Sequence, residues 1–277
     1  MSEADDFLTT ALKLLPEKPA DTAPQKEKKR FSELLSAQLA LAFGAELERR
    51  GLKGARPTTP GEVDLSGAER RMAGGIGAKK VDVTWSTEES GLLLAISIKS
   101  INFRDKRSKN FQKNLTNRRG DMLFEAVTLH RRFPYAVLGG FFFFDKEAES
   151  DGTPARKATF LNAHDRFRLF TGRTDPAGRD EQYERLYVVL IEANKFQPKA
   201  RIFLAGAPEQ EVPLATAFDE LIELVAERNP DFYEAVDGRL RRVQEGRGSG
   251  KKVKATKGGE LQVEADDDDD DESGETE

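Results

Sequence analysis

Apolar and polar residues alternate along the chain with two periodicities, one typical of helices and one typical of strands. Residues 31–50 carry an apolar stripe at helical spacing, and Gly51 ends it. Beyond a loop rich in Pro and Gly, segments 81–85 (VDVTW) and 92–98 (LLLAISI) have the β-branched and apolar content of strands, and the turn STEESG separates them. The pattern therefore predicts a helix followed by a β-hairpin. The stripe consists of Phe31, Leu35, Leu39 and Ala42.

The middle of the chain predicts a second helix and a buried strand. Residues 108–133 have a helical apolar side and end before Pro134. Residues 135–144 (YAVLGGFFFF) are apolar on both faces, which is typical of a strand at the centre of a sheet. The apolar side of the helix consists of Phe111, Leu115, Met122, Ala126 and Leu129.

Weaker patterns follow. Segments 185–193 and 200–206 have strand character, and residues 216–229 predict a terminal helix that opens after a threonine cap. Residues 157–170 fit either structure. The order of elements implies an α/β fold with a mixed central sheet and helices on both of its faces.

The ends of the chain differ from this middle part. We expect residues 1–29 to form a flexible N-terminal arm that could carry a short docking helix, because Pro, Lys and Glu dominate their second half. Residues 30–240 form the predicted folded domain. Residues 241–277 predict a disordered tail, with a Gly and Lys linker that leads into the aspartate run 266–271.

Composition narrows the classes of protein and of site. The 277 residues include no cysteine, so any metal site must use oxygen or histidine ligands. The longest apolar run, 136–144, is too short to cross a membrane, and the acidic start does not have the pattern of a secretion signal. We therefore expect a cytoplasmic protein without a membrane partner. The two histidines are isolated in the sequence, and we expect a structural role for both.

The net charge of −5 hides a basic core. The last 14 residues hold ten acids and no base, so without them 44 basic residues stand against 39 acidic ones. Between Lys99 and Arg132, ten basic residues face three acidic ones, a surplus that predicts contact with phosphates, although a solvated helix face would look the same. The candidate DNA contacts are Arg104, Lys106, Arg107, Lys109, Lys113, Arg118 and Arg119.

Three polar residues of the hairpin suggest chemistry. Asp82 stands between two valines of an apolar strand, where an unpaired charge is costly. Ser97 and Lys99 are two apart in the next strand, so both leave the same face, which hairpin pairing can bring beside Asp82. A carboxylate that holds Mg²⁺ and a lysine that orients or deprotonates water suit phosphodiester hydrolysis. A buried structural salt bridge is the alternative interpretation of Asp82 and Lys99.

The segment GIGAKKVDVTWSTEESGLLLAISIKS, with the basic helix and the apolar strand that follow, resembles the core of the PD-(D/E)xK nucleases. The resemblance covers roughly residues 30–145 and implies a restriction-endonuclease-like αβββαβ core. It implies that Asp82 is the motif aspartate, that Lys99 is the motif lysine, and that the Ile98 carbonyl is a metal ligand. It also implies Mg²⁺ as cofactor, with Mn²⁺ as a substitute.

The sequence departs from this family at Ser97, where the second motif acid is expected. Glu46 is the first candidate to replace that acid, because it projects from the apolar stripe of the first helix. Glu125, or else Gln112, in the second predicted helix is the alternative.

Two functions of different classes follow from the resemblance. The first is a metal-dependent DNA endonuclease of a restriction or phage-defence system, which could act as a homodimer or beside a partner subunit. The second is an inactive nuclease fold that binds DNA or recruits a subunit, suggested by Ser97. A scaffold whose acidic tail binds a basic partner is a third and more distant hypothesis.

Overall fold

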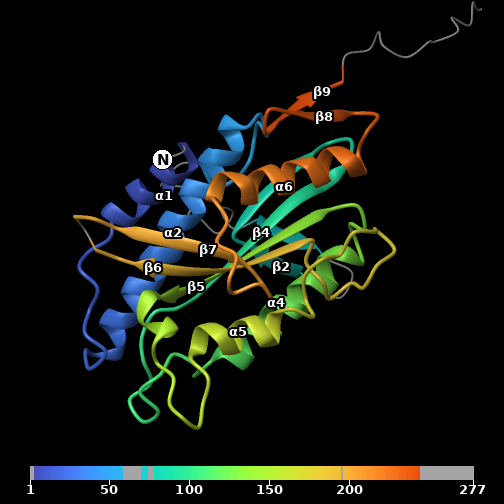
Figure 1. Ribbon diagram of the computed structural model, residues 1–277. Coiled ribbons are helices and arrows are strands. Elements are labelled where there is room, and N and C mark those ends of the chain that lie inside the picture. Colours follow the sequence, from blue (N-terminus) through green and yellow to red (C-terminus); the bar gives the residue numbers. More distant parts are fainter. Residues whose placement is uncertain (1–2, 59–69, 74–77, 195, 244–277) are drawn as a thin grey trace, which may run out of the picture. The chain divides into compact units, whose positions relative to one another are not determined.

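A computed structural model describes residues 3–58, 70–73, 78–194 and 196–243 (Figure 1). Its centre is a five-stranded sheet in the order β3-β4-β5-β6-β7. The middle three strands are parallel, and the two edge strands are antiparallel to their neighbours. The predicted mixed sheet and the predicted central place of the phenylalanine-rich strand are therefore confirmed. The strands are β3 (Val83–Thr87), β4 (Gly91–Ile101), β5 (Val137–Asp145), β6 (Arg185–Glu192) and β7 (Lys199–Leu204).

Helices cover both faces of the sheet, because β5 is apolar on both. Phe141 and Phe143 pack in one core with helices α1 (Glu3–Lys13), α2 (Gln25–Arg49) and α6 (Leu214–Arg228). Phe142 and Phe144 pack in a second core with α4 (Leu115–His130) and α5 (Thr159–Phe167). Figure 1 shows the same division, with α1, α2 and α6 on one side of the sheet and α4 and α5 on the other. The predicted α/β fold with helices on both faces is confirmed.

Smaller elements complete the fold. Strands β1 (Arg70–Ala73) and β2 (Ala78–Val81) form an antiparallel hairpin that leads into β3. Strands β8 (Tyr233–Val236) and β9 (Arg239–Arg242) form another hairpin after α6, and the 3₁₀ helix η1 (Lys146–Glu149) follows β5. Among the described residues, no helix combines the length and the hydrophobicity needed to cross a membrane.

Several boundaries differ from the prediction. Helix α4 begins at Leu115 and not at Ser108, because residues 105–114 form turns in which Lys109 and Asn114 have positive φ angles of 55° and 70°. Helix α6 begins at Leu214 after an N-cap at Pro213, so Thr216 lies inside the helix and does not cap it. The ambiguous segment 157–170 contains helix α5.

The N-terminal residues, expected to form an arm, contain two helical segments. Helix α1 buries Leu8 and Leu12 in the core beside α2, and α2 begins at Gln25, five residues before the predicted domain start. Lys18, between the two helices, pairs with Asp145 at the end of β5 at 2.6 Å. At the other end, residues 244–277, with the predicted linker and acidic run, lie outside the described residues.

Candidate active site

The hairpin of β3 and β4 brings the three motif positions to one face of the sheet. Asp82 lies between β2 and β3, and Ser97 and Lys99 lie in β4. Side chains alternate along a strand, and Ala95 and Ile101, which share their side of β4 with Lys99, belong to the core that contains α4. Ser97 and Lys99 therefore point toward α4.

Lys99 lies between two carboxylates. Its Nζ is 3.2 Å from Oδ2 of Asp82 and 3.7 Å from Oε2 of Glu125, which α4 supplies. The same Oδ2 of Asp82 accepts a hydrogen bond of 2.6 Å from the backbone N–H of Ile98. The strand that carries the lysine therefore also fixes the aspartate, and α4 brings the second acid from above the sheet.

Burial and charge act against each other at Lys99, whose side chain is 14% exposed. Burial lowers the pKa of Lys99, but the carboxylates of Glu125 and Asp82 outweigh that effect, so its pKa is raised. Lys99 therefore stays an ammonium ion at neutral pH.

Tyr183, which the sequence patterns did not single out, lies next to Ser97. Its buried hydroxyl donates to the carbonyl of Met122 at 3.1 Å and lies beside the Ser97 hydroxyl. Burial raises the pKa of Tyr183 well above its usual value, so the phenol stays protonated. Gly140 pairs with Ser97 across the sheet, and a Cβ there would stand 3.2 Å from the Tyr183 ring and 2.5 Å from Leu186. The glycine pair in a strand apolar on both faces could have signalled this close approach.

Glu46, the first candidate for the missing acid, lies elsewhere, which corrects that preference. The carboxylate of Glu46 accepts from Arg49 at 2.7 and 2.8 Å and from Arg50 at 2.5 Å. Because α2 covers the opposite face of the sheet from α4, Glu46 and Lys99 stand on different sides. Arg50 also pairs with Asp219 of α6 and donates to the carbonyl of Gly238 at 2.8 Å.

The second candidate, Glu125, is the acid that the structure places beside Lys99. Gln112 lies in the loop before α4, and its side chain donates to the carbonyl of Lys157 at 3.2 Å. The helix that was expected to offer an alternative acid therefore supplies it, and does so from the middle of α4.

The oxygen atoms around Lys99 fit a magnesium ion. Asp82 and Glu125 each offer a carboxylate, and the Ile98 carbonyl faces the side of Asp82, because the N–H and C=O of one strand residue point the same way. Mg²⁺ prefers oxygen ligands and is commonly held by one or two carboxylates with water in the remaining positions. Within the described ranges, no group of three or more His, Asp or Glu side chains suits a metal. The fit therefore rests on two carboxylates and a carbonyl.

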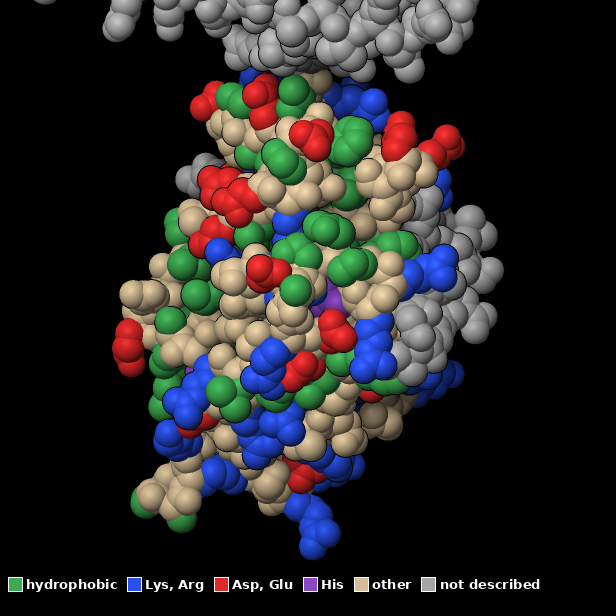
Figure 2. Space-filling model, turned by 90° about the vertical axis from the view of Figure 1, so that its right-hand side faces the viewer, with side chains coloured by type: hydrophobic (Ala, Val, Ile, Leu, Met, Phe, Trp, Pro, Cys, Tyr) green, Lys and Arg blue, Asp and Glu red, His purple; other side chains and the backbone are tan. Residues whose placement is uncertain are grey.

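The seven candidate DNA contacts divide into two groups. Lys106, Arg107 and Lys109 are exposed, and the described residues give them no ion pair with a carboxylate. Lys and Arg side chains gather on the lower half of the face that Figure 2 displays. The other four have partners in the protein: Arg104 with Glu147, Lys113 with Asp105, Arg118 with Asp121, and Arg119 with the ring of Phe170.

Both histidines have partners in the protein interior. His130 lies 2.9 Å from the carbonyl of Asp180 and 3.3 Å from the carboxylate of Glu184. Nδ1 of His164 accepts from the N–H of Gly206 at 3.1 Å, and burial lowers the pKa of His164 to about 4. These surroundings are those of structural histidines.

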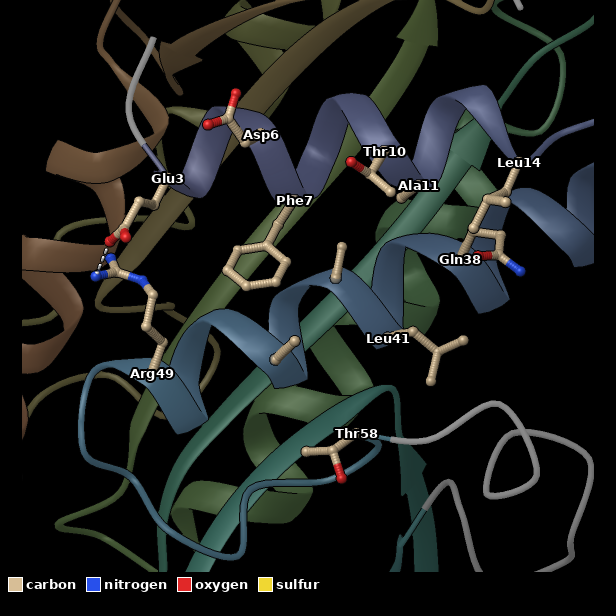
Figure 3. A pocket seen from close by; sticks show the side chains of 12 residues that line it. Glu3, Asp6, Phe7, Thr10, Ala11, Leu14, Gln38, Leu41, Arg49 and Thr58 are labelled. Carbon is tan, nitrogen blue, oxygen red and sulfur yellow. Dashed lines mark ion pairs between the residues drawn. The ribbon is translucent and has the colours of Figure 1, made fainter.

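A pocket of about 470 Å³ lies between α1 and α2 (Figure 3). Phe7 of α1 and Leu41 of α2 line it, and the ion pair of Glu3 with Arg49 stands at one end. Since α2 lies across the sheet from Lys99, this pocket is separate from the candidate active site.

Comparison of the chain with models of protein families, with curated proteins and with solved structures finds no match.

Proposed function

We propose that this chain is a metal-dependent DNA endonuclease whose working side chains are Asp82, Glu125 and Lys99. One observation carries the proposal: a buried ammonium lies 3.2 and 3.7 Å from two carboxylates that come from a strand junction and a separate helix. Metal-assisted phosphodiester hydrolysis needs acids that hold a cation and a positive group that stabilises the charge of the transition state. Perturbed ionisable groups gathered in this way are typical of functional sites.

Asp82, Glu125 and the Ile98 carbonyl are the groups that would hold Mg²⁺, with Mn²⁺ as a substitute. The ion, when bound, supplies Lewis-acid activation of the phosphate and of a water molecule. In this proposal Glu125 takes the place of the second motif acid, which Ser97 cannot provide. Ser97 is instead buried beside the hydroxyl of Tyr183.

Of the two roles considered for Lys99, to deprotonate water or to orient it and stabilise charge, we assign the second. Although burial lowers the pKa of Lys99, the carboxylates of Glu125 and Asp82 raise it, which favours an ammonium that stabilises charge over a neutral amine that accepts a proton. Its ammonium can stabilise the negative charge that develops on the phosphate and can orient the attacking water. The restriction or phage-defence setting, with a homodimer or a partner subunit, belongs to the same proposal.

The test is cleavage of supercoiled plasmid by the purified full-length chain with Mg²⁺, with Mn²⁺ and with a chelator. Asp82→Ala and Lys99→Ala are the test variants, and Lys157→Ala, which removes an exposed lysine paired with Asp165, is the matched control. We expect metal-dependent nicking or linearisation that both test variants lose and the control keeps. Cleavage that survives in both test variants would sink the proposal.

Ser97 favours a second candidate, a nuclease fold that binds DNA without cutting it. The Ser97 side chain is buried and carries no carboxylate at the position where the related motif has its second acid. A protein that retards the plasmid on a gel but does not cut it with either metal would support this candidate. A cut product would exclude it.

A further inference from the structure

The loop between β4 and α4 presents exposed cations on a short turn. Lys106, Arg107 and Lys109 stand at its tip and are exposed. Arg104 and Lys113, at the two ends of the same loop, already pair with Glu147 at 3.3 Å and with Asp105 at 2.7 Å. The three cations of the tip are therefore the ones best placed to meet a ligand in solution.

Asp105 holds the turn in shape. Its Oδ1 accepts from the N–H of Arg107 at 3.0 Å and from the N–H of Ser108 at 3.1 Å. Its backbone carbonyl accepts from the N–H of Lys109 at 3.0 Å, and its own N–H donates to the carbonyl of Asn110 at 2.8 Å. Asp105 thus fixes the backbone at Arg107, Ser108 and Lys109, and Lys106 is its direct neighbour in the chain.

The base of the turn is anchored in the protein. Phe111 is fully buried, and its N–H donates to the buried carboxylate of Asp151 at 2.9 Å. The Asn110 side chain accepts from the N–H of Gln112 at 3.0 Å. Because the backbone on both sides of the tip is fixed, little ordering of the loop would be needed when it binds.

We propose that residues 105–110 form a preorganised contact for the phosphate backbone of duplex DNA and that Asp105 is its positioning residue. The ligand that fits the tip is a polyanion, since the tip offers three exposed cations. The tip exposes no aromatic ring on which unpaired bases could stack, because Phe111 points into the core. This assignment rests on the proposed function, since it names the surface that would present DNA to the candidate active site.

The first test measures how the affinity for a short fluorescein-labelled duplex depends on salt, by anisotropy with the full chain in chelator so that no cutting occurs. Each phosphate contact adds about 0.9 to the slope of log affinity against log salt. The triple variant Lys106→Gln, Arg107→Gln, Lys109→Gln should therefore lose about 2.7 of that slope. The matched control is Lys13→Gln, Lys29→Gln, Lys199→Gln, which removes three exposed cations from other elements and should leave the slope nearly unchanged.

The second test separates the charge of Asp105 from its role in holding the turn. Asp105→Asn keeps an oxygen that can accept from the N–H groups of Arg107 and Ser108, whereas Asp105→Ala keeps none. Both variants remove one negative charge, so charge alone predicts equally tighter binding by both. We expect Asp105→Asn to bind as tightly as the wild type or more tightly, and Asp105→Ala to bind about threefold to tenfold more weakly than Asp105→Asn.

The outcomes distinguish this inference from the proposed function. If the wild type binds the duplex while the triple variant keeps its full slope, the turn is not the contact, although the nuclease proposal stands. If the two Asp105 variants bind alike, Asp105 is not a positioning residue. If a single strand of the same length binds as tightly and loses the same slope, the assignment to duplex DNA is wrong. If the wild type neither binds nor cuts DNA, the proposed function itself fails. Thermal unfolding of each variant verifies that a loss of binding is not a loss of fold.

Discussion

Glu46 and Glu125 are equally buried, each 1% exposed, and each lies on a helix that covers the sheet, yet their surroundings differ. Glu46 is held by two guanidinium groups at 2.5–2.8 Å. Glu125 stands 3.7 Å from the ammonium of Lys99, beyond ordinary hydrogen-bonding distance, and shares that ammonium with Asp82. Two helix-borne acids of equal burial are therefore paired with different cations, guanidinium groups at Glu46 and a shared ammonium at Glu125.

The difference separates a structural ion pair from a candidate reactive one. The Arg50 partner of Glu46 is itself fixed by Asp219 and by carbonyls of Ala215 and Gly238, so those charges are matched within the protein. At Lys99 one compact cation serves two acids from separate elements, which is an arrangement that a divalent cation could replace. Burial and charge alone therefore do not separate the two acids, whereas the kind of cation and the number of acids that share it do.

The largest effect on stability is expected from breaking the ion pairs of Glu46 with Arg49 and Arg50. Glu46→Gln removes the carboxylate that Arg49 and Arg50 share, while Glu3 and Asp219 remain, so the free energy of unfolding should fall by about 3 kcal/mol, the lower end for a broken buried ion pair. Chemical denaturation measures this change. Plasmid cleavage below the unfolding temperature should stay near the wild-type rate, and a loss of cleavage in the folded variant would place Glu46 in the chemistry after all.

A third buried acid, Glu184, also has several partners, and its pKa predicts how much its charge stabilises the fold. Burial raises the pKa of Glu184, but His130, Arg228 and the N–H of Leu138 outweigh it and hold the pKa at about 2. Because this folded-state pKa lies below the ordinary value of 4.5, the carboxylate stabilises the fold above pH 4.5. That contribution, on the order of 3 kcal/mol, should be lost as the pH falls from about 4.5 to about 2.

The measurement is the free energy of unfolding against pH for the wild type and for Glu184→Gln. The variant should be less stable at neutral pH and should have a flatter dependence in this window. An unchanged dependence would show that Glu184 does not carry the acid sensitivity.

The next effect concerns the cluster of Asp82, Lys99 and Glu125. Glu125→Gln keeps the shape of the side chain but removes a charge from the candidate metal site, so cleavage should fall on the order of 10²-fold or more. The matched control is Asp121→Asn, an exposed acid one turn earlier in α4, which should keep its activity. If the two variants are equally active, Glu125 has a structural role, as Glu46 does, and takes no part in cleavage.

The smallest effect sharpens the role of Lys99. If the ammonium competes with a divalent cation for Asp82 and Glu125, then Lys99→Met should bind Mn²⁺ about tenfold more tightly while losing cleavage. Electron paramagnetic resonance of Mn²⁺ measures the affinity without reference to activity, with Lys157→Met as the control. Weaker binding by Lys99→Met would contradict the competition.

Local patterns predicted much of this fold. The hairpin of β3 and β4 is short in sequence, so alternation within two strands was sufficient to bring Asp82 and Lys99 together. The residues of β5 are apolar on both faces, and this pattern predicted its central position in the sheet. In such elements the information lies within a few neighbouring residues.

The errors came from contacts between distant segments. A helical stripe shows that Glu46 points inward but not which face of the sheet its helix covers, and that choice separated it from Lys99. Phe111 fits the helical stripe of α4, yet it is buried from a loop that Asp105 and Asp151 hold together. Tyr183 reaches Ser97 from 86 positions further along the chain, and no periodicity carries that information.

The anchoring of Arg50 has a consequence for how the protein is made. Its partners Asp219 and Gly238 lie 169 and 188 positions further along the chain. During synthesis from the N-terminus, helix α2 is therefore made long before Asp219 and Gly238, the residues that bind Arg50 at its C-terminal end. The joint between α2, α6 and the final hairpin can close only after the ribosome has added residue 238, so the nascent chain should gain its full resistance to proteolysis late and abruptly.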